Sequence, residues 1–277
     1  MEGYLLVITI IRPDSKTNDY LAECWRKRLV LRFFIRRDLV VRYRQTALGV
    51  AWVLVKPLLA MAIFTVVFNR IAGLPSGGVP YPLLVLTGML PWQFLASVTG
   101  EAANSIVNNP SLVTKVYFPR LLMPASALVL NAVDLGVGLL FLVAVMTWYG
   151  VAPAPTAPLA LIPLLAVAAA SFGLGLLLAA LMVRYRDVRN VIPVALQFGL
   201  LASPVAFSAM AAPEPWRSLI WLNPLAGPLE SLRWCLLPGY PQPPLVTVFA
   251  GHAACVLLLV VGYTLFRRWE HRFADVL

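Results

Sequence analysis

The chain has 277 residues, of which 60% are hydrophobic and only 12% are charged. Soluble domains are roughly half apolar and about a quarter charged, so this composition excludes an ordinary soluble protein and also a disordered chain. The 22 Lys+Arg against 12 Asp+Glu give a net charge of +10, which in a membrane protein indicates basic cytoplasmic loops and headgroup contacts rather than nucleic-acid binding. The three Cys and two His are scattered, so we expect no disulfide framework and no metal site.

Residues 1–48 are expected to form a cytoplasmic segment with an amphipathic helix. The apolar run from Tyr4 is short and lacks a cleavage site, so we expect no secretory signal and a chain that is retained whole. Between residues 16 and 45, apolar side chains fall near one helical face: Ala22, Trp25, Leu29, Phe33 and Val40. Basic side chains fall opposite: Lys27, Arg28 and Arg32. Such a helix should lie in the inner membrane interface.

Six apolar stretches are each long enough to cross a bilayer core of about 30 Å. They are residues 49–68, 83–107, 121–148, 159–183, 191–210 and 245–266. The N-terminal segment, the second and fourth loops and the tail hold 18 Lys and Arg, whereas the other three loops hold 3. Positively charged loops stay in the cytoplasm, so both termini are expected there, and an even number of spans agrees.

These features predict an all-α integral membrane protein. We expect a six-helix transmembrane domain over residues 49–266 and a cytoplasmic tail over 267–277. The outer segment 211–244 is rich in Pro and Trp and should form short helices at the outer surface. No internal repeat and no soluble domain of useful size is evident.

Motifs for catalysis are missing from the sequence. There is no GxxxxGK[ST] phosphate loop, so we expect no ATP hydrolysis by that route and no enzyme activity of the chain's own. Charges inside a span are costly, and Glu101 and Asp134 are expected to make helix-packing hydrogen bonds rather than to catalyse. The small residues Ser171, Gly173 and Gly175 predict a close helix approach, either within the chain or at a subunit seam.

Three segments together resemble a known family. The first is RDLVVRYRQTALG at 37–49, followed by Trp52 and Lys56-Pro57. The second runs from PYP at 80–82 through GMLPW at 88–92 and Asn104-Ser105 to LVTKVYFPR at 112–120. The third is YRDV at 185–188, with WLNP at 221–224 and ESLR at 230–233. In their order and spacing they resemble the permease of type-2 ABC exporters for polysaccharides, most nearly the O-antigen and teichoic-acid export permeases.

The resemblance implies the type-2 ABC exporter transmembrane fold and a set of partners. This chain would form a homodimer, joined by two copies of a separate cytoplasmic ABC ATPase that binds ATP and Mg. No cofactor would be bound by the chain itself. The substrate would be a glycan, commonly carried on a polyprenyl-pyrophosphate lipid, and it would be exported across the bacterial inner membrane.

The resemblance also assigns roles on the cytoplasmic side. The basic helix resembles an interface helix, where the pyrophosphate of the lipid or ordinary anionic headgroups could meet four arginines: Arg36, Arg37, Arg42 and Arg44. Residues 109–119 resemble the coupling helix that docks into the ATPase. Its predicted contact residues are Leu112, Val113, Lys115, Val116, Tyr117 and Phe118.

Aromatic rings could line a sugar path or instead form a lipid-facing belt. The channel candidates are Phe64, Phe68, Trp92, Phe94, Phe198 and Phe207. By resemblance, the outer segment forms an outer gate with Trp216, Trp221, Asn223 and Pro224, and the alternative is that its tryptophans anchor it in the interface.

Two other functions are compatible with the topology. A membrane enzyme acting on lipid-linked sugars would require ionisable residues near an outer loop, and those loops contain only Arg70, Glu214, Arg217, Glu230 and Arg233. An exporter of a lipid or drug built on the same fold fits the topology equally well. The match at Gly49-Val50-Ala51-Trp52 and at Tyr117-Phe118-Pro119-Arg120 favours glycan export. An ion channel is a distant third because no span has a filter-like face.

Overall fold

The computed structural model describes residues 17–44 and 51–273, and within these ranges the chain is helical or irregular, with no strand. The expected start of the first span at Gly49 and the side chain of Arg44 lie outside the described part.

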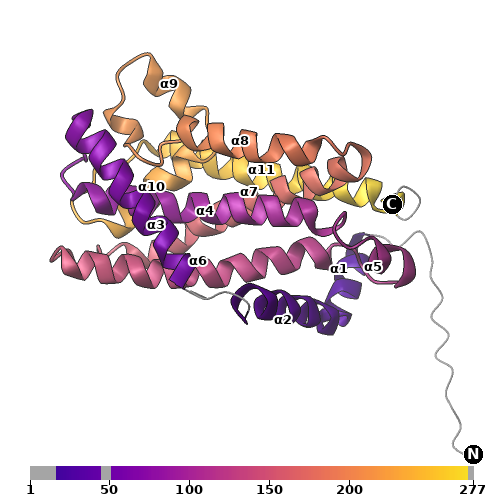
Figure 1. Ribbon diagram of the computed structural model, residues 1–277. Coiled ribbons are helices and arrows are strands. Elements are labelled where there is room, and N and C mark those ends of the chain that lie inside the picture. Colours follow the sequence, from indigo (N-terminus) through magenta and orange to yellow (C-terminus); the bar gives the residue numbers. More distant parts are fainter. Residues whose placement is uncertain (1–16, 45–50, 274–277) are drawn as a thin grey trace, which may run out of the picture.

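Within the described ranges, five helices are long and apolar enough to cross a membrane. The first, Val53–Ile71, combines α3 (Ala51–Phe64) with the π-helical η1 (Thr65–Ile71). The others are α4 (Tyr81–Ser105), α6 (Leu122–Trp148), η2 (Ala157–Ala160) continuing into α7 (Leu161–Arg184), and α11 (Leu245–Glu270). Figure 1 shows α4, α6, α7 and α11 running alongside one another. Five of the six predicted spans therefore have a matching helix.

The remaining predicted span, 191–210, is shorter than expected. Its helix, α8 (Val188–Ala202), has 15 residues. At 1.5 Å per residue it is about 22 Å long, less than a bilayer core. The chain then turns through residues 203–207 and enters η3 (Ala209–Ala211). Residues 203–210 are thus not part of a continuous span, and the count of six stays a prediction.

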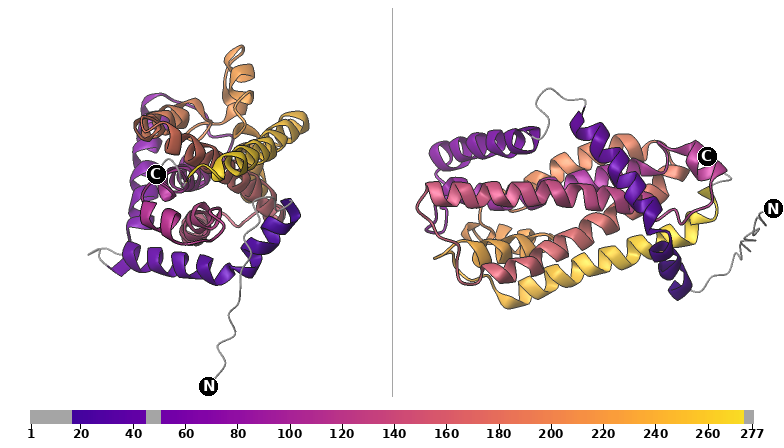
Figure 2. Two further views of the ribbon diagram at one scale, coloured as in Figure 1. Left: turned by 90° about the vertical axis from the view of Figure 1, so that its right-hand side faces the viewer. Right: turned by 90° about the horizontal axis from the view of Figure 1, so that it is seen from below.

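The N-terminal basic segment forms two helices outside the bundle, α1 (Thr17–Arg26) and α2 (Arg28–Arg44), and α2 packs against α6. Figure 2 shows them along one side of the bundle. Tyr20 and Phe34 are buried against the bundle, whereas the predicted apolar face is exposed at Trp25, Leu29 and Phe33. The helical prediction is confirmed, and the place of this face in a membrane interface stays a prediction.

Helix α4 is at the centre of the bundle. Of its most apolar 18-residue window, 78% is buried, compared with 6% for Val53–Ile71. It contacts α3, α6, α7, α8 and α10. Pro82 lies in its first turn, where the missing N–H breaks no hydrogen bond. The chain therefore forms a bundle packed around α4, and the first span is its most exposed one.

The small-residue run packs inside the chain. A Cβ on Gly262 of α11 would lie 2.0 Å from the carbonyl oxygen of Gly173, so only glycine permits this helix crossing. A Cβ on Gly175 would lie 2.7 Å from the Cβ of Ala102 on α4. Of the two alternatives left open by the sequence, the structure shows internal packing of α7 against α11 and α4.

The two ends of the bundle differ. The α5 end carries α1, α2, α5 (Pro110–Lys115) and the end of α11, and both described chain ends lie there (Figure 1). The α9 end carries α9 (Trp216–Trp221) and α10 (Ala226–Leu236).

Candidate functional site at the α5 end

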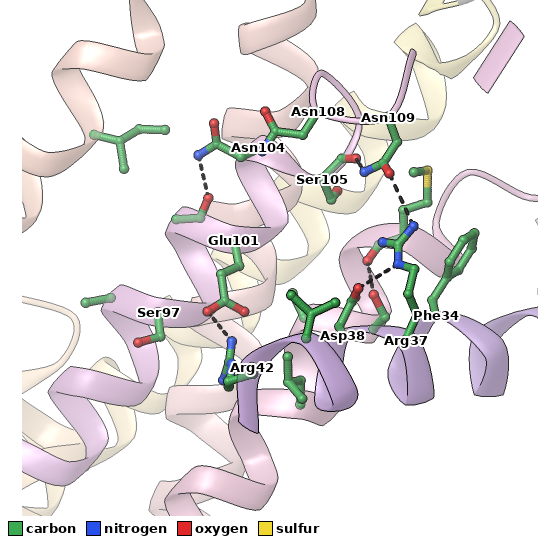
Figure 3. A pocket seen from close by; sticks show the side chains of 18 of the residues that line it. Phe34, Arg37, Asp38, Arg42, Ser97, Glu101, Asn104, Ser105, Asn108 and Asn109 are labelled. Atoms are coloured by element: carbon green, nitrogen blue, oxygen red, sulfur yellow. Dashed lines mark hydrogen bonds and ion pairs between the residues drawn. The ribbon is translucent and has the colours of Figure 1, made fainter. Parts of the chain in front are cut away.

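A cavity of about 840 Å³ opens at the α5 end between α2, α4, α6 and α8. Much of its polar lining comes from one face of α4, where the spacing of three or four residues places side chains in a stripe. The stripe consists of Ser97, Glu101 and Asn104 on α4 and continues to Asn108 and Asn109 beyond the end of the helix (Figure 3).

Two arginines approach this stripe from different helices. Arg37 of α2 donates from Nη1 to Asn109 Oδ1 at 3.3 Å and from Nε to Asp38 Oδ1 at 2.8 Å. Arg189 of α8 donates from Nη2 to Asn108 Oδ1 at 2.6 Å and from Nε to Asn104 Oδ1 at 3.2 Å. The sequence analysis included Arg37 but missed Arg189, although this residue directly follows the YRDV motif.

A third arginine, Arg42, joins α2 to the bundle. Its Nη1 donates to Asp134 Oδ2 at 2.6 Å and to Asn131 Oδ1 at 3.2 Å, and its Nη2 donates to Glu101 Oε1 (Figure 3 shows the last pair). Asn131 also donates to Glu101 Oε2 at 2.8 Å. The expected helix-packing bond between α4 and α6 is thus present, but the principal partner of both carboxylates is an arginine from α2.

Tyr43 reinforces this junction by donating to Asp134. Burial, followed by this hydrogen bond, raises the pKa of Tyr43 to about 12. The tyrosine is therefore a neutral donor at physiological pH. Of the four arginines predicted to meet pyrophosphate, Arg37 and Arg42 line the cavity, Arg36 is exposed and does not, and Arg44 lies outside the described side chains.

The predicted coupling segment divides into an anchor and an exposed surface. Val113 and Phe118 are buried in the core of the α5 end, where the Phe118 ring lies 5.6 Å from that of Phe34. Leu112 is half-buried. Lys115, Val116 and Tyr117 are exposed and are the ones that a partner could contact. Val113 and Phe118 instead hold the segment on the bundle.

The C-terminal helix ties the exit of this segment to α1. Glu270 Oε1 accepts from the Tyr20 hydroxyl at 2.7 Å and from the Arg120 N–H at 3.0 Å, and its Oε2 accepts from Arg267 at 2.6 Å. Burial, followed by the charge of Glu270, raises the pKa of Tyr20. This junction was not predicted, because the sequence indicates only a cytoplasmic tail after the last span and gives no partner for Glu270.

The predicted outer gate lies at the α9 end. Trp216 is exposed and Trp221 half-buried. Asn223 donates to Ser203 Oγ at 2.8 Å and accepts from the Leu225 N–H at 2.9 Å, and the carbonyl of Pro224 accepts from the Cys255 thiol.

The same end contains a buried ion pair between two residues that the sequence analysis placed in an outer loop. Glu230 and Arg233 are 2.9 Å apart and 0% exposed. Arg233 also donates to the carbonyls of Val205 and Phe207, which fixes the turn after α8. The two charges therefore pair with each other inside the protein and are not available to an outer active site.

The six predicted channel rings do not share one surface. Phe64 and Phe68 are half-buried and pack with each other at 5.6 Å between ring centroids. Trp92 and Phe94 are buried in the core around α4, Phe207 is half-buried, and Phe198 is exposed.

Comparison with known proteins identifies the family to which this chain belongs. The family model described as ABC-2 type transporter matches residues 30–237. The O-antigen export system permease protein RfbA of Klebsiella pneumoniae is 26% identical over 245 residues, which are 87% of this chain and 92% of that protein. Its namesake from Myxococcus xanthus is 27% identical over 259 residues (91% and 97%). The polysialic acid transport protein KpsM of Escherichia coli is 23% identical over 252 residues (84% and 91%). The chain is a multi-pass membrane protein that belongs to the ABC-2 type transporter family.

Proposed function

We propose that this chain is the permease of an ATP-driven exporter that moves a polysaccharide across the bacterial inner membrane. The observation that carries the proposal is the match, over most of both chains, to permeases named for O-antigen export and polysialic acid transport. The membrane-enzyme alternative loses support because Glu230 and Arg233, which it would need in an outer loop, are buried and paired with each other.

Two copies of a separate cytoplasmic ATPase, which binds ATP and Mg, supply the energy. The absence of a phosphate loop from the sequence supports a separate subunit. The exposed Lys115, Val116 and Tyr117 form the docking surface. Lys27 donates to the Tyr117 carbonyl at 3.3 Å and lies 4.5 Å from the centre of its ring, so a force on this segment would reach the α1–α2 junction. Both termini are then cytoplasmic.

A second copy of the chain completes the channel. Helix α4 occupies the centre of each protomer, so a path for a polymer requires a space between copies. The span Val53–Ile71 is covered least by its own protomer and is the natural face for that assembly. Phe64, Phe68, Phe198 and Phe207 are the predicted channel rings that are not fully buried. Helix α9, with Trp216 and Trp221, forms the outer gate.

The cavity at the α5 end receives the head of a lipid-linked glycan. Its three arginines, Arg37, Arg42 and Arg189, and the amides of α4 suit a diphosphate, since guanidinium groups match phosphate oxygens in pairs. An ordinary anionic phospholipid headgroup is the competing occupant.

The test is reconstitution with the ATPase encoded beside this chain. We expect a complex of two permeases and two ATPases whose ATP turnover responds to lipid-linked glycan and delivers it into the vesicle lumen. Tyr117→Asp should abolish coupling without unfolding the permease. Tyr149→Asp, a change of the same type at an exposed position at the α9 end, is the matched control. A chain that binds no ATPase and modifies lipid-linked sugars would establish the enzyme instead.

A further inference from the structure

The cavity at the α5 end borders a second one. The second cavity, of about 550 Å³, extends from Arg42 toward α3 and is lined by Lys56, Gln93, Phe94 and Asp134. Arg42, Ser97 and Glu101 line both cavities. Gln93 and Phe94 lie farther from the α5 end along α4 than Glu101 does. We therefore call the cavity of about 840 Å³ that opens at the α5 end the outer cavity, and the one of about 550 Å³ the inner cavity.

The ion pairs of Arg42 cross the boundary between them. The guanidinium reaches from α2 to Glu101 on α4 and to Asp134 on α6, and we call these two ion pairs the Arg42 bar. Arg42, Glu101 and Asp134 are half-buried, with side-chain exposures of 25%, 40% and 21%. A ligand in the outer cavity therefore has direct access to the bar.

The charges favour an exchange of partners. A carboxylate and a phosphate present similar oxygen pairs to the guanidinium fork, so they compete for the same N–H groups. A diphosphate brings more negative charge than either carboxylate, and Arg37 and Arg189 attract it to the same cavity. If Arg42 turns to phosphate, Lys56 is the cation of the inner cavity that is left to face Glu101 and Asp134.

We propose that Arg42 is a specificity-determining residue that recognises an anionic diphosphate by exchanging Glu101 and Asp134 for phosphate oxygens. The exchange opens the Arg42 bar and joins the outer cavity to the inner one. A neutral lipid has no group that can replace the carboxylates, so it leaves the bar closed. The inference rests on the proposed function for the presence of a diphosphate lipid.

Thiol accessibility in the complete permease–ATPase complex tests this step, with inside-out vesicles that expose the cytoplasmic face. In a Cys24→Ser background, Gln93→Cys reports on the inner cavity and Ser105→Cys on the outer one, because each lines only one of the two. A cationic, membrane-impermeant thiol reagent is used, with farnesyl diphosphate as the probe and farnesol as its neutral control.

We expect farnesyl diphosphate to slow labelling of Ser105→Cys and to speed labelling of Gln93→Cys by at least roughly tenfold, the lower end of what one hydrogen bond to a charged group is worth. Farnesol should change neither rate. Glu101→Gln should speed labelling of Gln93→Cys without any probe. Asp38→Asn, which removes a carboxylate that lines only the outer cavity, should leave that labelling slow.

Protection of Ser105→Cys with no change at Gln93→Cys would show that Arg42 keeps its carboxylate partners when the diphosphate binds. That result would overturn the proposed exchange. No response at either position would also overturn it, because the diphosphate would not bind there. Neither result affects ATP-driven glycan export in the reconstituted vesicles, which tests the proposed function separately. Arg42→Lys, which keeps the charge but loses the fork, should assemble with the ATPase yet lose most of the response to farnesyl diphosphate. If Glu101→Gln fails to assemble with the ATPase, the labelling of Gln93→Cys and Ser105→Cys in chains that keep the Arg42 bar still decides whether the exchange occurs.

Discussion

Replacing Arg233 with Met is expected to destabilise the α9 end strongly. The substitution introduces an apolar side chain of similar length but leaves Glu230 charged and without its cationic partner. Both groups are 0% exposed, and removal of one partner of a buried ion pair costs about 3–5 kcal/mol. The carbonyls of Val205 and Phe207 lose their donor as well, so the turn after α8 should loosen.

The chain contains a matched control in the same outer segment. Glu214 and Arg217 have the same spacing of three residues, but their side chains are 60% and 42% exposed and their atoms are 3.6 Å apart. An exposed pair contributes only about 0–1 kcal/mol, so Arg217→Met should have little effect. Combining Glu230→Gln with Arg233→Met removes the stranded charge and should recover part of the loss.

The assay is the apparent melting temperature of the purified chain in detergent, read as the loss of the monodisperse peak after heating. Heating of a membrane protein is often irreversible, so the four proteins are ranked under one protocol. The expected order, from least to most stable, is Arg233→Met, the double variant, Arg217→Met and the unmodified chain. Equal shifts for Arg233→Met and Arg217→Met would refute the reasoning, as would a double variant less stable than Arg233→Met.

Three further predictions concern other parts of the bundle. Gly262→Ala forces α11 away from α7 and should cost about 1–3 kcal/mol in the same melting assay, whereas Gly100→Ala, which meets nothing within 4 Å, should be neutral or stabilising. Val113→Asp should lower the melting temperature because it buries a charge, whereas Tyr117→Asp should not; equal losses would contradict the division into anchor and surface. Burial, followed by the charge of Glu270, raises the pKa of the Cys24 thiol from 9.0 to about 11. The thiolate fraction at pH 8 is therefore roughly a hundredfold smaller than that of a free thiol. Alkylation of Cys24 should be correspondingly slow at pH 8 and should speed up as the pH approaches 11. Alkylation at the rate of a free thiol would contradict this.

Most spans could be predicted from the sequence because a long apolar run satisfies its backbone internally and can be covered by lipid. The prediction failed at 203–210 for a tertiary reason. Arg233, which follows this segment by more than twenty residues, binds the carbonyls of Val205 and Phe207 and holds a turn where composition alone suggested a continuing helix. The burial of that arginine depends on α10 and α4 coming together, which no local pattern reports.

The candidate site was predictable in kind but not in its pairing. A charge in a span requires a partner, so Glu101 and Asp134 could be singled out from their positions. Their shared partner Arg42 is 59 residues from the first and 92 from the second, and the family resemblance assigned it to the lipid's pyrophosphate or to anionic headgroups. Arg189 was missed because its role depends on α8 starting beside the end of α4. The predicted coupling segment contains the short helix α5, and only packing shows that Val113 and Phe118 face inward.

The junction at Glu270 also sets an order for the synthesis of the chain. Tyr20 emerges among the first residues, yet its hydrogen-bond acceptor lies 250 residues later, at the end of the final span. Until α11 is inserted, the amphipathic N-terminal helices and the loop at Arg120 have no carboxylate to bind at that position. The proposed docking face for the ATPase is therefore completed last, and we expect a nascent chain lacking α11 to present an unfinished surface that an ATPase does not bind.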